Sequence, residues 1–260
     1  MPPGSSAASL LAGLRNRDRR LIGRAITEIE NDSRVGAELA TLLQSGPGQA
    51  FTIGLTGPPG AGKSTLVGSL VPLLLERGHR VAVLLIDPSS PLTGGALLGD
   101  RIRLSQVAAS DALYVRSLGN RGAVGGVTSA IRTVIAAMSV AGFDLVLIET
   151  VGAGQSDVSI TAIADFTICA LPPGLGDSVQ ALKAGIQEVA DMFVVTKGDR
   201  PGADQLFRQL RATARRATDS LPRPVIVTSS NDGSGLAAVA DELSRRSGPY
   251  EGALHGPEAG

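Results

Sequence analysis

Apolar positions along this chain form two kinds of pattern, which alternate from residue 51 onward. Short runs rich in β-branched residues are mostly apolar throughout, as is typical of strands buried on both faces of a sheet. They occupy residues 51–55, 81–86, 113–115, 145–148, 166–171, 192–195 and 225–228. Apolar residues at helical spacing fill the stretches 63–77, 128–141, 178–190, 203–217 and 236–246. The alternation predicts an α/β fold with a doubly wound, mostly parallel sheet, which binds ligands beyond the carboxyl ends of its strands.

A helical lead precedes the first predicted strand. Between Asp18 and Leu43 apolar residues recur at helical spacing, and Asn31-Asp32-Ser33 divides this stretch into two helices. Residues 1 to about 12 are small and polar with Pro and Gly, so we expect them to be mobile.

Composition limits the classes of function. Of 260 residues, 43% are hydrophobic, and the formal net charge of zero gives no reason to expect nucleic acid or an anionic membrane as partner. No window approaches the ~18 apolar residues of a membrane span, and the arginine-containing N-terminus does not resemble a signal peptide. The single Cys169 lies in an apolar run, so we expect a buried thiol and a cytoplasmic, reducing location.

The clearest chemical motif directly follows the first predicted strand. The phosphate-loop (P-loop) pattern Gly-x-x-x-x-Gly-Lys-Ser is complete, and its glycines let backbone N–H groups converge on phosphate oxygens. The next helix adds unpaired N–H donors and a positive dipole end. Lys63 is expected to reach the β- and γ-phosphates, and Ser64 to offer its hydroxyl to Mg²⁺. The predicted nucleotide site comprises Gly57, Pro58, Pro59, Gly60, Ala61, Gly62, Lys63, Ser64 and Thr65.

A second motif indicates the base. Thr196-Lys197-Gly198-Asp199 follows the predicted strand 192–195 and is similar to the Asn-Lys-x-Asp motif of GTPases. Asp199 can accept hydrogen bonds from guanine N1–H and the exocyclic amine, which adenine does not offer, while the stem of Lys197 lies along the ring. Thr196 replaces the usual Asn with a hydroxyl, which bears on guanine affinity. The loop that closes over the base is expected at Thr228, Ser229 and Ser230.

Lysine is rare, and its positions are informative. Lys63, Lys183 and Lys197 are the only lysines among 24 basic residues. An arginine-rich coding bias explains the rarity, whereas a need for a compact ammonium explains why these positions keep lysine.

The next segments resemble one family closely. Glu149 stands where most GTPases have the Asp of Asp-x-x-Gly, and it is followed by Gly152 and by Gly154-Gln155-Ser156. Four further segments complete the pattern: Asp87-Pro88-Ser89-Ser90-Pro91, Thr93-Gly94-Gly95, Leu98-Gly99-Asp100 and Arg116-Ser117-Leu118-Gly119-Asn120-Arg121-Gly122. From about residue 16 to residue 246 the chain resembles the MeaB/ArgK/MMAA family, G-protein chaperones of adenosylcobalamin-dependent acyl-CoA mutases.

The resemblance implies residue roles and a partner. It implies a GTP hydrolase that uses GTP/GDP and Mg²⁺, gates adenosylcobalamin loading, and protects or reactivates a B12-dependent acyl-CoA mutase. It places Mg²⁺ at Ser64, Asp87, Asp100 and Glu149, and a second switch at Gly152 to Gln155. Together with Lys63, the residues Asp87, Asp100, Glu149 and Gln155 would form the catalytic set. A third switch, which relays nucleotide state to the mutase, would use Asp177, Gln180 and Lys183.

The chain then divides into a helical lead (1–48), a P-loop G domain (49–246) and an irregular Gly/Pro-rich tail (247–260). Family members usually continue into a helical arm that dimerises, so the resemblance predicts a monomer or weak homodimer for this chain. His79 and His255 fit no cobalamin-binding pattern and are expected to be exposed bystanders.

Two other functions remain open. One is a nucleotide-bound adaptor that holds the mutase with negligible turnover. The other is a transport-associated kinase or ATPase, which Asp199 disfavours because that residue selects against adenine.

Overall fold

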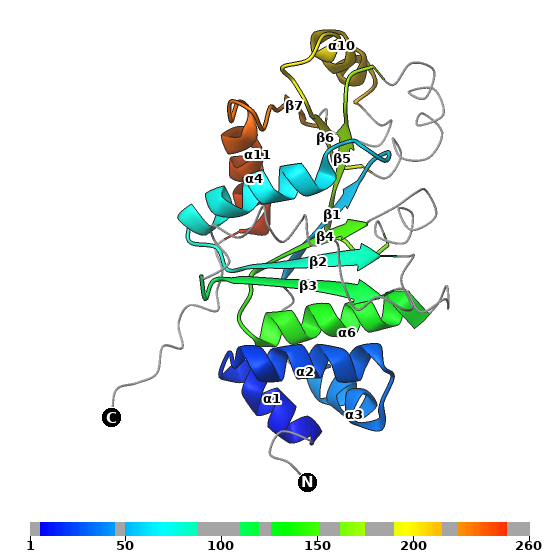
Figure 1. Ribbon diagram of the computed structural model, residues 1–260, viewed down its shortest axis with the longest axis vertical. Helices are drawn as coiled ribbons and strands as arrows, with labels where there is room; N and C mark the ends of the chain where they lie inside the picture. The colour runs from blue at the N-terminus through cyan, green and yellow to red at the C-terminus, as the bar shows by residue number, and fades with distance from the viewer. Residues whose placement is uncertain are drawn as a thin grey trace.

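The computed structural model describes residues 6–44, 50–87, 110–119, 126–150, 162–174, 190–214 and 223–248. Its centre is a seven-stranded sheet in the order β3-β2-β4-β1-β5-β6-β7, with every neighbouring pair parallel (Figure 1). The strands are β1 (Phe51–Thr56), β2 (Val81–Asp87), β3 (Leu113–Gly119), β4 (Leu145–Thr150), β5 (Phe166–Leu171), β6 (Met192–Val195) and β7 (Val225–Val227). The predicted α/β fold class is confirmed.

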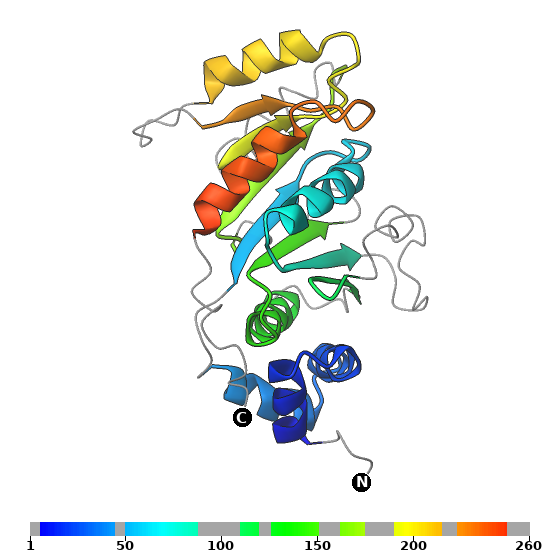
Figure 2. The same ribbon diagram turned by 90° about the vertical axis from the view of Figure 1, so that its left-hand side faces the viewer.

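Helices cover both faces of this sheet, which is why its strands are apolar throughout. Side chains of a strand point alternately to opposite faces. In β2, Val83 and Leu85 pack with α4 (Lys63–Glu76) and α11 (Leu236–Ser247), whereas Leu84 and Ile86 pack on the side of α6 (Gly126–Val140). Figure 2 shows α4 and α11 side by side on one face. The helix α10 (Ala203–Thr213) packs on β6 and β7, at the end of the sheet that lies opposite to β3.

The predicted element boundaries agree with the observed ones to within a few residues, with one larger difference. The strand β3 continues from the predicted end at residue 115 to Gly119 and stays paired with β2 throughout. The polar pair Arg116-Ser117 lies within this strand, so a run of apolar residues predicts only its first part. Residues 178–189 of one predicted helix, and residues 215–217 of another, lie outside the described residues.

The N-terminal segment forms three helices: α1 (Ala7–Arg15), α2 (Arg19–Glu30) and α3 (Arg34–Leu43). Asp18 and Ser33 cap α2 and α3 by accepting hydrogen bonds from backbone N–H groups. The expectation of mobility up to about residue 12 is wrong, because α1 begins at Ala7 and buries Leu10 and Leu14 completely.

This helical lead packs on α6 and shares one apolar cluster with the sheet (Figure 1). A polar contact fastens it to the edge strand β3. Arg116 donates hydrogen bonds to Thr27 and Glu30, each at 3.0 Å, and the backbone N–H of Gly119 donates to Glu30 at 3.2 Å. The polar residue that interrupts the β3 pattern is therefore the residue that binds the lead.

His79 is not an exposed bystander, which corrects the sequence-based expectation. Its side chain is 11% exposed and joins three elements. Nδ1 lies 2.7 Å from the Asp144 carboxylate, and Nε2 lies 2.8 Å from the hydroxyl of Ser244 in α11. Asp144 also accepts a hydrogen bond from the backbone N–H of Arg80 at 2.5 Å. The network holds α11 against the turns that precede β2 and β4. His255 lies outside the described residues.

Two further sequence-based expectations concern Cys169 and membrane-spanning helices. Cys169 is buried at 1% exposed, as predicted. None of the helices in the described ranges has the length and apolar character needed to cross a membrane.

Candidate nucleotide site

The phosphate loop occupies the carboxyl end of β1, between the ends of β4 and β5. Gly57 follows β1 with φ of +141°, and a Cβ there would lie 2.1 Å from the carbonyl oxygen of Ala170 in β5. Only glycine fits this approach. Gly62, with φ of +86°, is the N-cap residue directly before α4, and it offers no side chain to cap the helix. The first N–H groups of α4 are therefore available to an anion at the loop.

Lys63 is buried and points back over the loop. Its ammonium donates a hydrogen bond to the carbonyl of Gly57 at 2.7 Å and a longer one to Pro58 at 3.5 Å. Both partners are backbone carbonyls of the P-loop. A buried ammonium held by carbonyls can transfer its hydrogen bonds to phosphate oxygens that enter the same loop.

Ser64 and Glu149 meet beside this ammonium. The Ser64 hydroxyl donates to a carboxylate oxygen of Glu149 at 2.5 Å, and Glu149 is 2% exposed at the end of β4. A hydroxyl and a carboxylate are hard oxygen ligands of the kind that Mg²⁺ accepts, usually with several waters retained. The described side chains form no group of three or more His, Cys, Asp and Glu placed to hold a metal. Ser64 and Glu149 therefore have the chemistry of part of a Mg²⁺ ligand set.

The predicted base-recognition motif lies next to the P-loop and is bonded to it. Lys197, with φ of +53°, donates from its ammonium to the carbonyl of Gly60 at 2.7 Å. Its side chain thus reaches the P-loop, with Cε 4.0 Å from where a Cβ of Gly62 would lie. Gly198 donates to the carbonyl of Thr228 at 2.8 Å, which joins this motif to the loop after β7.

Thr196 has a structural part that the motif comparison does not reveal. Its hydroxyl donates to the carbonyl of Ala61 at 2.6 Å, and its side chain is 5% exposed. The hydroxyl that replaces the usual amide therefore holds the P-loop through the carbonyl of Ala61. We expect any effect of Thr196 on nucleotide affinity to act through the position of the loop.

Asp199 is exposed at the mouth of the site and has a partner that the sequence did not single out. The side-chain amide of Asn231 donates to Asp199 at 2.8 Å. Asn231 belongs to a turn in which the backbone N–H of Ser234 donates to Asp232 at 2.9 Å, and this hydrogen bond lowers the pKa of Asp232. The signal in the sequence is the turn composition Asn231-Asp232-Gly233 directly after the predicted closing loop.

The three predicted loop residues differ in what they offer. Thr228 and Ser229 are buried, and Thr228 donates through its N–H to Val195 at 2.7 Å. Ser230 is exposed, with its hydroxyl 3.2 Å from that of Ser69 in α4. Thr228 and Ser229 therefore fix the loop, and Ser230 is the member whose side chain faces outward.

The remaining predicted site residues are not placed beside these groups. Asp87 ends β2 at the same edge of the sheet, although its side chain is not described. Asp100, Gly152, Gln155, Asp177, Gln180 and Lys183 lie outside the described residues.

Comparison with known proteins agrees with this site. The family model "Methylmalonyl Co-A mutase-associated GTPase MeaB" matches residues 22–251. The chain belongs to the MeaB family of GTPases.

Two relatives and one solved structure align with most of this chain. A Mycobacterium tuberculosis protein named as a GTPase is 40% identical over 91% of this chain and 73% of its own length. The mouse protein "Methylmalonic aciduria type A homolog, mitochondrial" is 35% identical over 90% of this chain and 61% of its own length. A crystal structure named "LAO/AO transport system kinase" superposes with a TM-score of 0.71 at 26% identity, covering 91% of this chain and 73% of that one. The predicted MeaB/ArgK/MMAA resemblance is confirmed, and the fold is that of a P-loop GTPase.

Replacing Thr196 by Val tests whether its hydroxyl positions the P-loop of this MeaB-family chain. Val removes the donor and leaves the Ala61 carbonyl buried without it, a loss of ~1–3 kcal/mol. We expect nucleotide affinity to fall about tenfold, measured with a fluorescent GDP analogue. Thr196→Ser keeps the hydroxyl and should bind like the wild type. Equal affinity of the Val variant and the wild type would contradict a positioning role.

Proposed function

We propose that this chain binds and hydrolyses GTP at the P-loop and uses the nucleotide state to gate adenosylcobalamin loading into an acyl-CoA mutase. One observation carries the nucleotide part of the proposal. The P-loop and the base-recognition motif form one hydrogen-bonded unit through Thr196–Ala61 and Lys197–Gly60. A phosphate cradle and a guanine-selective carboxylate are thereby held at a fixed separation, as a single nucleotide requires.

The phosphate end would work through charge and position. Lys63 would exchange its carbonyl partners for phosphate oxygens, and the N–H groups of α4 would donate to the same anion. Ser64, Glu149, Asp87 and Asp100 would hold Mg²⁺, which neutralises charge on the β- and γ-phosphates when bound. Gln155 would orient the attacking water. Gly152 would contact the γ-phosphate.

The base end would select guanine. One oxygen of Asp199 is already engaged by Asn231, so the carboxylate is oriented before a base arrives. Guanine would donate N1–H and its exocyclic amine to Asp199, and the stem of Lys197 would cover one ring face. Adenine has neither of these two donors at the corresponding positions.

The mutase part of the proposal rests on the family. The family is that of the methylmalonyl-CoA mutase-associated GTPases, and the mouse relative is named after methylmalonic aciduria. Asp177, Gln180 and Lys183 would pass the nucleotide state to the mutase. The chain would act on that partner in the cytoplasm.

Two other functions make different predictions. A nucleotide-bound adaptor would bind the mutase with GTP but release almost no phosphate. A kinase would move the γ-phosphate to an acceptor, and the similar crystal structure bears a transport kinase name. The exposed, Asn231-oriented carboxylate of Asp199 favours a guanine-specific site over an ATP-dependent kinase.

Asp199→Asn should change the base preference. An Asn amide offers one acceptor and one donor, so each charge-assisted bond that is lost costs ~1.5–3 kcal/mol and GDP affinity should drop about tenfold or more. Xanthosine diphosphate should bind the variant better than the wild type. The matched control is Asp204→Asn, an exposed carboxylate in the first turn of α10 that should leave the preference unchanged. Calorimetry in which wild-type protein binds ADP as tightly as GDP would overturn the base assignment.

GTP turnover during a titration with a purified acyl-CoA mutase tests the coupling. Alone, the chain should hydrolyse GTP at about 10⁻⁴–10⁻² s⁻¹, the range of GTPases that no partner stimulates. A mutase that binds the hydrolysis-competent state better should raise this rate severalfold at saturation.

Released phosphate and phosphorylated acceptor are measured in the same samples, and Lys63→Ala is the inactive control. If a non-hydrolysable GTP analogue holds the chain in a complex with the mutase, but the mutase leaves the rate of GTP turnover unchanged, the adaptor would be established instead. Transfer of phosphate to an acceptor would establish the kinase.

A further inference from the structure

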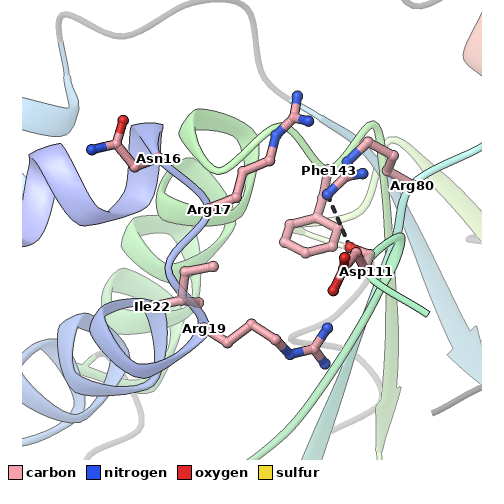
Figure 3. A pocket seen from close by; sticks show the side chains of 7 residues that line it. All are labelled: Asn16, Arg17, Arg19, Ile22, Arg80, Asp111 and Phe143. Atoms are coloured by element: carbon pink, nitrogen blue, oxygen red, sulfur yellow. Dashed lines mark hydrogen bonds between the residues drawn. The ribbon is translucent and has the colours of Figure 1, made fainter. Parts of the chain in front are cut away.

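A second candidate binding site lies at the opposite edge of the sheet from the P-loop. A cavity of about 400 Å³ opens between the α1–α2 turn and the residues that precede β2, β3 and β4 (Figure 3). Because the strands are parallel, these residues mark the amino edge, whereas the P-loop follows the carboxyl end of β1. The cavity is lined by Asn16, Arg17, Arg19, Ile22, Arg80, Asp111 and Phe143.

The lining has an excess of positive charge. Three guanidinium groups and one carboxylate give a formal sum of +2 (three minus one). In Figure 3 Asp111 lies between Arg80 and Arg19, and within the described ranges its carboxylate forms no ion pair. This excess of positive charge in the lining suits an anionic ligand.

Two of the arginines are held in place by backbone and aromatic contacts. Arg19 donates to the carbonyls of Ser110 at 3.2 Å and Leu113 at 2.9 Å, and its guanidinium lies 5.8 Å from the centre of the Tyr114 ring. Arg80 donates to the carbonyls of Gly142 and Asp111, each at 3.0 Å. The acceptors of Arg19 are neutral carbonyls, so they orient its guanidinium without neutralising it, and the carbonyls of Gly142 and Asp111 orient that of Arg80.

Arg17 ends α1 in a hydrogen-bonded turn, in which its own N–H donates to the carbonyl of Leu14 at 3.0 Å and the N–H of Asp18 donates to that of Gly13 at 2.9 Å. The φ of +58° at Arg17 is the left-handed conformation at the end of α1, which favours glycine. The residue in the equivalent place after α2 is Asp32, a type that tolerates this conformation through local hydrogen bonds. The Arg17 guanidinium rests against Gly142, where a Cβ would approach it to 3.0 Å. It has no carboxylate or hydrogen-bond acceptor among the described residues.

We propose that this cavity binds a small anion that carries phosphate, such as a phosphate monoester or pyrophosphate. Arg17 would supply a planar fork of uncommitted N–H donors, which matches two oxygens of one phosphate group. The fixed cations of Arg19 and Arg80 would add attraction from the other sides of the cavity. A ligand here would bridge the helical lead and the amino edge of the sheet, and the site is independent of GTP hydrolysis.

The test is isothermal titration of the full chain with pyrophosphate in the presence of saturating GDP at low salt. Arg17→Gly is the informative variant, because glycine suits the left-handed backbone and should leave the thermal midpoint unchanged or raised. We expect pyrophosphate affinity to fall about tenfold in this variant and in Arg17→Gln. Arg20→Ala, an exposed arginine of α2 outside the cavity, should bind like the wild type.

The difference in pyrophosphate affinity between the wild type and Arg17→Gly reports binding at the cavity, whether or not GDP fills the P-loop. Failure of the proposed GTPase function would therefore leave this result readable. Equal affinities of these two proteins for pyrophosphate would overturn the proposal. Tighter binding of succinate than of pyrophosphate would overturn the phosphate assignment, and a lowered thermal midpoint of Arg17→Gly would assign Arg17 a structural role instead.

Discussion

The parallel alignment of β4, β1, β5 and β6 is the constraint on which the nucleotide site depends. It brings four strand ends to one edge, so residues far apart in the chain meet there without long loops to hold them. Glu149 reaches Ser64 from the end of β4, and Thr196 reaches Ala61 from the end of β6. Gly57 can follow β1 only because it has no Cβ to meet the Ala170 carbonyl. Sheet geometry thus supplies the positions, and short polar contacts convert them into one rigid unit.

Much of this arrangement could be predicted from the sequence because its signals are local. The apolar runs of the central strands and the eight-residue P-loop pattern depend on neighbouring residues alone, and both led to the correct class of fold. The buried thiol of Cys169 followed from the same runs. The roles proposed for Asp100, Gln155 and Lys183 remain predictions, because those residues lie outside the described parts of the chain.

What the sequence did not reveal depends on contacts between distant segments. Leu10 and Leu14 in a short, small-residue helix become core only when α2 and α6 are present. His79 lacks a local pattern, yet Asp144 and Ser244 enclose it from 65 and 165 residues away. The motif comparison predicts a base contact for Thr196, whereas its hydroxyl supports the P-loop, and no motif indicates that Asn231 binds Asp199. Each of these is a tertiary hydrogen bond or contact that local periodicity does not encode.

The central claim is that the carbonyl-bound ammonium of Lys63 is exchanged for phosphate when a guanine nucleotide binds. Calorimetric titration of Mg·GDP into the wild type and Lys63→Ala tests this most directly, with circular dichroism to confirm that the variant is folded. The account predicts saturable binding by the wild type and a loss of about a hundredfold or more in the variant, since a buried charge-assisted contact to phosphate oxygens is removed. Equal affinities in two equally folded proteins would contradict it.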